Sequence, residues 1–348
     1  MTPKIKKGIQ SSSVHLNRQK NYSAVLNTIR EHSAIIQPEI SRITDISYPT
    51  VRSIIIELKK KHLVRYIRKE NSSGGRRPLV ISFNQEAGYV AAVEIGMDFS
   101  GVISDLSGRI VFRGKTEFKN GLLNLKELNN YIKEIIKQSG IVRSKLLGIG
   151  IGISGLVNKA GEIIVKYYEN EKTRAVRDIL PVKEAARKEF KVPVMVLNDA
   201  DAGMMAEYYM GVAMNIDNGI YLLKRSTGMG FGILANGELL TGRDGFAGEN
   251  RGIFSVKAIE SLENNPKITE PLIDDLLKLI FFLNPEMIIF GGELSELSKE
   301  FLEQVKSEIV KQEPIYGNII LETASLKTDS VVCGMVYMLL QKFFSFNF

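Results

Sequence analysis

The sequence predicts an α/β protein in which an N-terminal winged helix-turn-helix is followed by a two-lobed body. Three observations lead to this fold class. Positive charge is concentrated near the N-terminus, apolar residues there follow a helical and then a strand spacing, and a pattern of three strands occurs twice in the remainder. At 348 residues the chain is long enough for two or three compact units.

The formal net charge of +7 is unevenly distributed. Residues 1–84 hold 16 Lys and Arg against 5 Asp and Glu, whereas the remaining chain holds 30 against 34. A basic head on a mildly acidic body indicates a polyanionic partner for the head alone. A basic surface that is merely solvated is the alternative interpretation.

Cysteine and histidine usage excludes several classes of protein. The one cysteine, Cys333, rules out an intrachain disulfide and fits a reducing compartment. All three histidines lie in the basic head, which leaves too few ligands for a typical zinc site in the body. The chain has neither an apolar run of roughly 18 residues nor a secretory signal. We therefore expect a cytoplasmic protein without membrane segments or metal.

Three helices are predicted in the basic segment after residues 1–16, which are polar and expected to be loose. Pro38 and Pro49 fall where the first turn of a helix tolerates proline, and Ser47 is a suitable N-cap for the third helix. The apolar stripes of the three helices are Tyr22, Val25, Leu26 and Ile29; Ile36, Ile40, Ile43 and Ile46; and Val51, Ile55 and Leu58.

The third helix is the one expected to enter the major groove of DNA. In a helix-turn-helix the second helix of the pair presents its N-terminal residues to base edges. The residues that this argument selects are Ser47, Tyr48, Thr50, Arg52 and Ser53. The run Lys59–Lys61 at the far end would contact phosphates or simply complement the helix dipole, and the sequence leaves both open.

A wing is predicted between strands at Leu63–Ile67 and Pro78–Phe83. Gly75, Arg76 and Arg77 stand at its tip, and two cations on a flexible tip suit a narrow, negative groove of DNA. A solvated hairpin tip is the alternative. The head is therefore predicted to bind DNA.

A weak internal duplication organises the body. Each copy opens with three strands and continues with helices and further strands, and a cleft between two such lobes is a usual ligand site. The predicted strands are Tyr89–Ile95, Gly101–Leu106, Arg109–Thr116, Leu147–Ile153 and Val194–Leu197 in the first copy, and Gly219–Lys224, Gly230–Leu234, Glu238–Thr241 and Met287–Phe290 in the second.

Polar and glycine-rich strings lie where predicted strands end. Asn198 and Asp199 follow a strand, and a carboxylate there suits a cleft, although Asp199 or Asp201 would also serve as a helix N-cap. The glycines of 228–232 either let a phosphate approach the backbone or form a bulge. Gly291–Gly292 is either a ligand platform or a tight turn.

Taken together, these strings resemble the ROK family, which comprises repressors, open reading frames and sugar kinases. The resemblance runs from about Leu16 to the final helix. It implies an actin-like (ribonuclease H-like) ATPase fold and, in the regulators, a winged helix and a homodimer or larger assembly. The segments on which the resemblance rests are Gly74–Pro78, Gly152–Gly155, Asn198–Ala200, Gly228–Gly232, Gly245–Glu249, and Asn284–Pro285 with Gly291–Gly292.

The resemblance also implies domains and site residues. The DNA-binding domain would occupy residues 1–84, the first lobe 85–197 and the second lobe 198–334, with a C-terminal helix at about 335–348 packing back on the first lobe. Asn170 is expected just before a helix. The implied effector-binding residues are Gly155, Asn170, Asn198, Asp199 and Glu249, and the implied vestigial nucleotide region comprises Glu94, Gly228, Gly230, Gly291 and Gly292.

Two departures separate this chain from the kinases of the family. Where those have an Asp-x-Gly-Gly-Thr-like turn that handles phosphates, Glu94–Asp98 adds a carboxylate that repels a nucleotide. After Glu249 the family's histidine and cysteine-rich zinc loop are missing. Asp199 matches the kinases' general base, but a base without a positioned phosphoryl donor performs no transfer. We expect no catalytic residue, no zinc and no other cofactor.

The resemblance thus implies a DNA-binding transcriptional repressor of carbohydrate-utilisation genes. Its partners would be double-stranded operator DNA and a small sugar or related metabolite bound in the cleft. Two alternatives stay open. One is a sugar kinase that retains a DNA-binding head, and the other is a repressor whose body has lost its ligand and serves as a dimerisation scaffold.

Overall fold

The computed structural model describes residues 8–67, 79–96, 98–117, 124–170, 173–226, 228–250, 252–263 and 266–345, with side chains from Asn17 onward except at 165–177. The chain divides into two compact units. The first comprises Met1–Tyr89, Ser104–Arg109 and Leu340–Phe348, and the second comprises Val90–Ile103 and Ile110–Leu339. In the described ranges, helices long and apolar enough to cross a membrane are absent.

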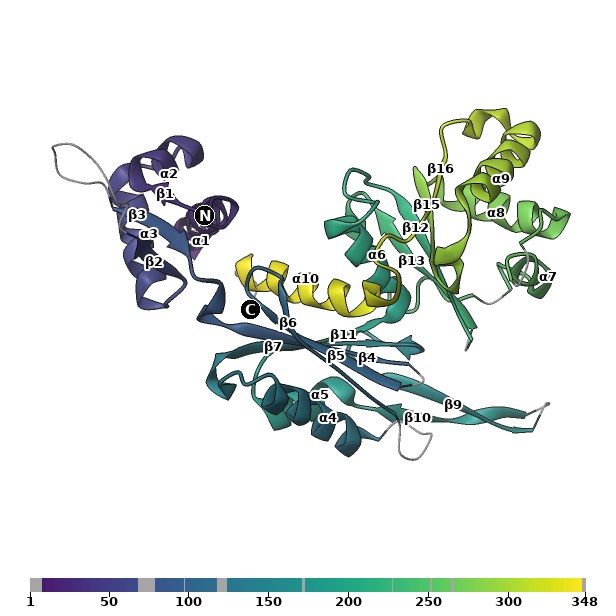
Figure 1. The fold of residues 1–348 in the computed structure, drawn as a ribbon, viewed down its shortest axis with the longest axis horizontal. Coiled ribbons are helices and arrows are strands. Elements are labelled where there is room, and N and C mark those ends of the chain that lie inside the picture. Colours follow the sequence, from purple (N-terminus) through teal and green to yellow (C-terminus); the bar gives the residue numbers. More distant parts are fainter. Residues whose placement is uncertain are drawn as a thin grey trace, which may run out of the picture. The chain divides into compact units, whose positions relative to one another are not determined.

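In the first unit three helices pack beside a small antiparallel sheet (Figure 1). The three predicted helices and both predicted strands are confirmed. Residues 8–16, expected to be loose, instead begin the first helix, and no proline interrupts the chain from Gly8 to Glu31. The elements are α1 (Gly8–Glu31), β1 (Ile35–Ile36), α2 (Gln37–Thr44), α3 (Tyr48–Lys60), β2 (Val64–Ile67) and β3 (Val80–Phe83), with the strand order β1-β3-β2.

The apolar stripes of these helices meet in one core. Ile43 is the exception: it is exposed, although the sequence places it on the stripe of α2. The helix ends at Thr44 because Asp45 takes a left-handed conformation (φ 53°), and Ile46, beyond this turn, is buried in its place. The buried members of the core include Tyr22, Val25, Leu26, Ile29, Ile35, Ile40, Ile46, Val51, Ile54, Ile55, Leu58 and Ile81.

The body contains two five-stranded sheets whose strand orders correspond. The first is β11-β7-β4-β5-β6 and the second is β16-β15-β12-β13-β14, so the first strand of each copy is central in its sheet. In each sheet two later strands lie on one side of the central strand and the rest of the opening triplet lies on the other. The predicted duplication is therefore confirmed at the level of topology.

The first lobe carries helices on both faces of its sheet, with α4 and α5 opposite α10 (Figure 1). Strands β11 and β7 run parallel. The elements of this lobe are β4 (Tyr89–Ile95), β5 (Asp98–Asp105), β6 (Ile110–Glu117), α4 (Leu125–Gln138), β7 (Leu146–Ile153), β8 (Leu156–Val157), β9 (Ile163–Asn170), β10 (Thr173–Leu180), α5 (Val182–Phe190) and β11 (Val194–Asn198).

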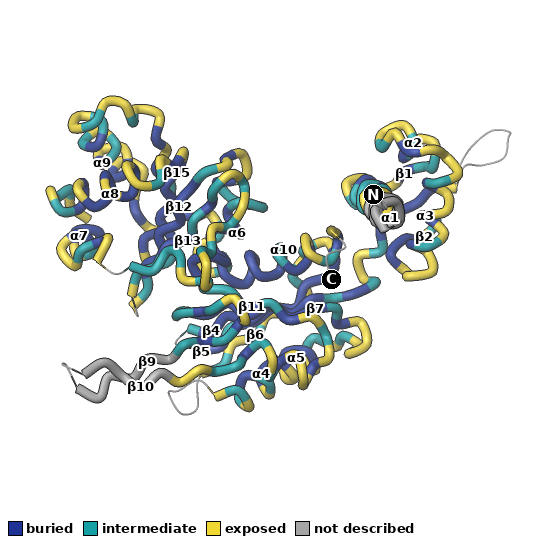
Figure 2. Tube along the Cα trace, turned by 180° about the vertical axis from the view of Figure 1, so that it is seen from behind, coloured by how far each residue is buried: buried dark blue, intermediate teal, exposed yellow. Residues whose placement is uncertain are grey.

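The second lobe packs helices around a sheet in which β12 pairs antiparallel with β13 and parallel with β15. Figure 2 shows the strands of this sheet, and α10, as largely buried. The elements are α6 (Asp199–Met210), β12 (Gly219–Arg225), β13 (Gly228–Ala235), β14 (Glu238–Leu239), α7 (Val256–Glu260), α8 (Glu270–Leu283), β15 (Met287–Gly292), α9 (Lys299–Gln312), β16 (Ile320–Thr323) and α10 (Ser330–Phe344).

One expected position is wrong. Asn170 does not precede a helix, because it is the last residue of β9, which pairs antiparallel with β10. The run of β-branched and aromatic residues at 163–168 explains why the segment forms a strand.

Alternating glycines let α10 pack closely on β7. A Cβ atom on Gly152 would lie 2.3 Å from Cγ1 of Val331, and one on Gly150 would lie 2.9 Å from Cβ of Met335. Side chains at either glycine would collide with the helix. These glycines are therefore a packing feature of the strand.

Candidate functional site

In the head, α3 has one buried face and one exposed face. Tyr48, Arg52 and Ser53 lie on the exposed face. Tyr48 keeps 47% of its surface accessible, and Ile56, one turn beyond Arg52, keeps 46%. Large side chains left open among polar ones, on a helix whose other face is fully packed, mark a surface available to a partner.

Two hydroxyl groups are held at the start of α3. Ser47 occupies the N-cap position, as the sequence predicts. Its Oγ lies 2.8 Å from Oγ1 of Thr50 instead of accepting a hydrogen bond from the helix backbone. Both hydroxyls therefore lie beside Tyr48 at the end of the helix that was predicted to read bases.

Two lysines of the run at the other end of α3, Lys59 and Lys61, are engaged within the head. Lys59 Nζ lies 4.4 Å from the centre of the Tyr66 ring, and Lys61 pairs with Glu57 at 3.3 Å. Glu57 also pairs with Arg18, at 3.2 Å. These contacts favour the structural role that the sequence left open for this run.

The predicted tip of the wing, with Gly75, Arg76 and Arg77, lies outside the described residues. The flanking strands are described, and they pair from Val64 with Phe83 to Ile67 with Val80.

In the body, the ends of β7 and β11 bring two predicted residues together. Nδ2 of Asn198 donates a hydrogen bond to the carbonyl oxygen of Gly155 at 2.9 Å. Oδ1 of Asn198 accepts one from the backbone N–H of Ala200 at 2.8 Å. Asn198 is therefore the N-cap of α6, a role that the sequence had offered to Asp199 or Asp201.

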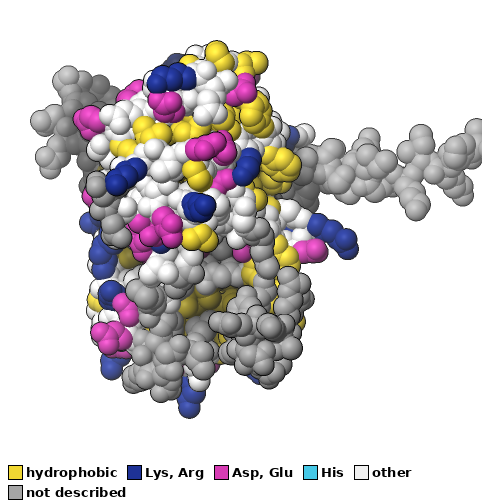
Figure 3. Space-filling model, turned by 90° about the vertical axis from the view of Figure 1, so that its right-hand side faces the viewer, with side chains coloured by type: hydrophobic (Ala, Val, Ile, Leu, Met, Phe, Trp, Pro, Cys, Tyr) yellow, Lys and Arg dark blue, Asp and Glu magenta, His cyan; other side chains and the backbone are white. Residues whose placement is uncertain are grey.

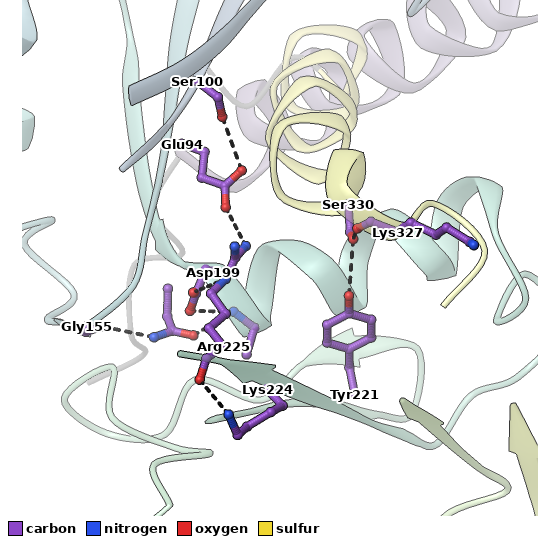
Figure 4. A network of polar contacts seen from close by, with 11 residues as sticks. Glu94, Ser100, Gly155, Asp199, Tyr221, Lys224, Arg225, Lys327 and Ser330 are labelled. Carbon is purple, nitrogen blue, oxygen red and sulfur yellow. Dashed lines mark hydrogen bonds and ion pairs between the residues drawn. The ribbon is translucent and has the colours of Figure 1, made fainter. Parts of the chain in front are cut away.

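A partly buried arginine joins two buried carboxylates (Figure 4). Arg225, the last residue of β12, donates a short hydrogen bond from its Nη2 to Oε1 of Glu94. Its Nε lies 3.1 Å from Oδ2 of Asp199, where the contact is ionic because the N–H is not aligned for a hydrogen bond. Ser100 Oγ donates to the other oxygen of Glu94 at 3.3 Å. Glu94 and Asp199 thus share one counter-ion.

Burial makes these carboxyl groups easier to protonate. It raises the pKa of Asp199 to about 6, although Arg225 acts in the opposite direction. Burial likewise raises the pKa of Glu94, against the lowering effects of Arg225 and Ser100. The guanidinium of Arg225 opposes this effect and favours the ionised form of both groups.

Asp201 adds a further buried carboxyl group on the same helix. Burial raises its pKa to about 8, and the charges of Asp199 and Glu249 act in the same direction. Within the described ranges its Oδ1 has no hydrogen-bond partner. Glu249 reaches this neighbourhood because it forms an isolated bridge with Gly230 of β13. Asp199, Asp201 and Glu249 therefore form one acidic neighbourhood.

Packing accounts for two of the predicted ligand glycines. A Cβ on Gly291 would lie 2.2 Å from Oη of Tyr221. Gly292 has a φ of +65°, and a Cβ there would lie 2.2 Å from the carbonyl oxygen of Lys224. The Gly291–Gly292 exit thus packs tightly on β12, and Gly292 also lines a cavity. Around Gly228, by contrast, a Cβ would meet nothing within 4 Å.

A cavity of about 920 Å³ lies on the Glu94 side of Arg225. Both residues line it together with Lys224, Gly292 and Asp329, whereas Asp199 is not among its lining residues. Arg225 therefore lines this cavity and also contacts Asp199, which does not line it.

The turn after Glu249 does not fit a zinc ion. Oδ1 of Asn250 accepts from the backbone N–H of Phe254 at 3.0 Å, its Nδ2 donates to the carbonyl of Phe254 at 3.2 Å, and α7 begins at Val256. Cys333 is buried in α10. The soft ligands that a structural zinc requires are therefore not supplied by this turn.

Sequence reasoning missed Arg225 and Asp201. The pair Lys224-Arg225 at the end of an apolar strand, just before a glycine-rich string, was an available signal. The burial of Asp201 is tertiary and left no local signal. The side chain of predicted Asn170 is outside the described set.

The arrangement has counterparts among known proteins. Residues 90–252 match the model of the ROK family. The xylose repressor of Bacillus spizizenii is 28% identical over 376 residues, which are 94% of this chain and 96% of that protein.

Two solved structures share the fold. A ROK family transcriptional regulator, described as a homolog of the Escherichia coli MLC protein, has a TM-score of 0.70 at 17% identity and covers 94% of this chain and 97% of its own. A ROK family glucokinase of Streptomyces griseus, in complex with glucose and AMPPNP, has a TM-score of 0.52 at 18% identity over 73% of this chain and 100% of its own. The chain thus carries a ROK family domain at residues 90–252 and is similar over nearly its whole length to a xylose repressor.

Proposed function

We propose that the chain is a DNA-binding transcriptional repressor of carbohydrate-utilisation genes, with a small sugar or related metabolite as effector. The observation that carries the proposal is the exposed face of α3, on a head with 16 basic and 5 acidic residues. Relatives named xylose repressor and N-acetylglucosamine repressor support it.

The head would act as a winged helix-turn-helix. Its third helix, with Ser47, Tyr48, Thr50, Arg52 and Ser53, would enter the major groove, where hydroxyl and guanidinium groups read base edges. Gly75, Arg76 and Arg77 would reach the adjacent minor groove as the wing. On the face of the second lobe that Figure 3 shows, Lys and Arg lie singly among Asp and Glu, which supports assigning DNA binding to the head.

The body would hold the effector. Sugar hydroxyls donate hydrogen bonds readily to carboxylates, and Asp199, Asp201 and Glu249 lie in one neighbourhood beside the capping residue Asn198. Gly155, tied to Asn198, would close the site from β7.

Sugar phosphorylation is the second candidate function, and Asp199 favours it. A base with a pKa of about 6 suits the abstraction of a hydroxyl proton near neutral pH. A phosphoryl donor in the large cavity would, however, meet Glu94 and Arg225 before Asp199. An arginine already neutralised by two carboxylates offers a transferring phosphoryl group little stabilisation. We therefore propose that the body has no catalytic activity and needs no cofactor.

Regulation would follow a population shift in a homodimer or larger assembly. Two heads would bind two half-sites at a fixed spacing. An effector that prefers one conformation of the body by a few kcal/mol would change the fraction of protein able to match that spacing.

Fluorescence anisotropy with the gene's own upstream DNA tests the proposal. We expect specific binding, measured against a scrambled duplex of equal length, and release by one sugar of a panel that includes xylose, glucose and N-acetylglucosamine. Equal affinity for both duplexes would contradict the repressor function. Specific binding that no sugar alters would favour a body without a ligand.

A further inference from the structure

The basic side chains in the wall of the large cavity beside Arg225 are already paired with acidic ones. Every Lys and Arg among its described lining residues is paired with a carboxylate. The N···O distances are 2.7 Å for Arg113–Asp329, 2.9 Å for Lys115–Asp98, 2.9 Å for Lys224–Glu263, 3.1 Å for Lys224–Glu293 and 2.8 Å for Lys327–Glu296, with the short contact Arg225–Glu94 in addition. A polyanion would therefore have to break an existing ion pair at each cation.

The pair of Arg225 with Glu94 differs from the others in its burial. The side chains of Glu94 and Asp199 are 9% and 8% exposed, whereas Asp329 and Glu296 in the other pairs are 42% and 72% exposed. Water and salt screen the exposed pairs but screen the buried cluster much less. The charge of Arg225 is thus compensated by the two most buried carboxylates among these pairs.

The charge balance around Arg225 disfavours anions. Two carboxylates contact one guanidinium, so an arriving phosphate would compete for Arg225 and face the repulsion of Glu94 and Asp199 together. An uncharged polyol meets neither obstacle, because its hydroxyls donate to carboxylate oxygens.

We propose that Glu94, Arg225 and Asp199 form a charge filter that makes the cleft selective for an uncharged polyhydroxy ligand and closes it to phosphorylated sugars and nucleoside triphosphates. This inference rests on the proposed sensor function, because it specifies the chemical class of the effector. It also predicts that the cleft would bind anions if one of the two carboxylates paired with Arg225 were removed.

Isothermal titration of the full-length protein with inorganic pyrophosphate tests the filter. Glu94→Gln keeps the size of the side chain and leaves Arg225 with only one anionic partner, so we expect pyrophosphate to bind at least roughly tenfold more tightly than to the unaltered chain. Glu293→Gln is the matched control in the same cavity wall. It should gain little, because the Glu293 side chain is 52% exposed and solvent already screens its charge, whereas the Glu94 side chain is 9% exposed.

Three outcomes would overturn the filter. They are tight pyrophosphate binding by the unaltered chain, no gain in Glu94→Gln, and an equal gain in Glu293→Gln, which would indicate a general charge effect. If Glu94→Gln does not fold, Asp199→Asn frees the same guanidinium and must show the same gain.

The operator-release assay with glucose and glucose 6-phosphate separates this inference from the proposed function. Release by an uncharged sugar alone supports both. Release by the phosphorylated form alone overturns the filter and leaves the repressor function standing. An absence of operator binding overturns the repressor function, while the pyrophosphate titration still decides the filter.

Discussion

Nε of Arg225 lies 3.1 Å from Oδ2 of Asp199, and the same guanidinium donates a hydrogen bond to Glu94. One cation on β12 therefore compensates two buried carboxylates, one at the start of α6 and one on β4. Buried charges are tolerated in proteins when they are paired, and their cost appears when a partner is removed.

Replacing Arg225 should destabilise the body markedly. Arg225→Ala leaves Glu94 and Asp199 buried without a counter-ion, and we expect a loss of about 3–5 kcal/mol in the free energy of unfolding at pH 8. The loss should be smaller at pH 5, because burial raises the pKa of both carboxyl groups and that of Asp199 to about 6, so that less uncompensated negative charge is buried as the pH falls. Urea denaturation at the two pH values measures it. Lys311→Ala, which breaks the exposed pair with Glu308, is the control and should cost under about 1 kcal/mol.

Asp201 should make the stability of the body depend on pH. Its pKa is raised from 3.8 to about 8 on folding, so between these values the folded state holds a proton that the unfolded state releases. The free energy of unfolding should therefore fall as the pH rises from about 4 to 8, by at most roughly 1.4 kcal/mol per pH unit. Asp201→Asn should flatten this slope, and Asp274→Asn, an exposed change on α8, should not. An unchanged slope in Asp201→Asn would show that the carboxyl group is ionised when folded.

The sequence predicted the strands and their duplication well, because local patterns specify them. β4, β6 and β12 begin within one residue of their expected positions, since alternating and β-branched apolar runs end at turns such as Ser107-Gly108. The α3 stripe was equally readable, because helical spacing determines which side is buried.

Only some of the residues in the cleft could be predicted from the sequence. Asn198 and Asp199 follow a strand, so their place at its end could be predicted, but the exchange of capping roles between them depends on side-chain geometry. Arg225 and Glu94 are 131 residues apart, and no local pattern connects them. The side-chain placement of Asn170 and the wing arginines stays a prediction.

Arg52 should contribute to DNA affinity more than the lysines at the far end of α3. We expect Arg52→Ala to weaken operator binding roughly 5- to 150-fold, since a guanidinium–base contact is worth about 1–3 kcal/mol. Lys59→Ala should have a smaller effect, because Lys59 lies over the Tyr66 ring. Anisotropy titrations at one salt concentration compare the two variants. Equal losses would indicate that the entire helix contacts phosphates.

The wing arginines should be visible in the salt dependence. Each phosphate contact contributes about 0.9 to the slope of log affinity against log salt. The double variant Arg76→Ala/Arg77→Ala should therefore reduce this slope by up to roughly 2. An unaltered slope and affinity would show that the wing does not touch DNA.

Asp199 should be required for the effector but not for DNA. Asp199→Asn removes a carboxylate acceptor without altering the head, so operator affinity should be retained while release by the sugar is lost. Asp274→Asn provides the same chemical change on a distant helix and should respond normally. A response that survives in Asp199→Asn would place the sensor elsewhere.

A side chain added to β7 at Gly152 should clash with α10, and a smaller residue on α10 should relieve the clash. Gly152→Ala places a Cβ only 2.3 Å from Cγ1 of Val331, which is closer than two non-bonded carbon atoms can approach. We therefore expect a loss of about 1–3 kcal/mol in the free energy of unfolding. Val331→Ala alone should also destabilise, because it leaves a cavity. In the double variant the small helix residue makes room for the new methyl group, so the combined loss should be less than the sum of the two. Urea denaturation of all four proteins gives the coupling energy. Strict additivity would mean that the backbone of α10 shifts to accommodate the added methyl group, and that β7 and α10 are not locked together by this contact.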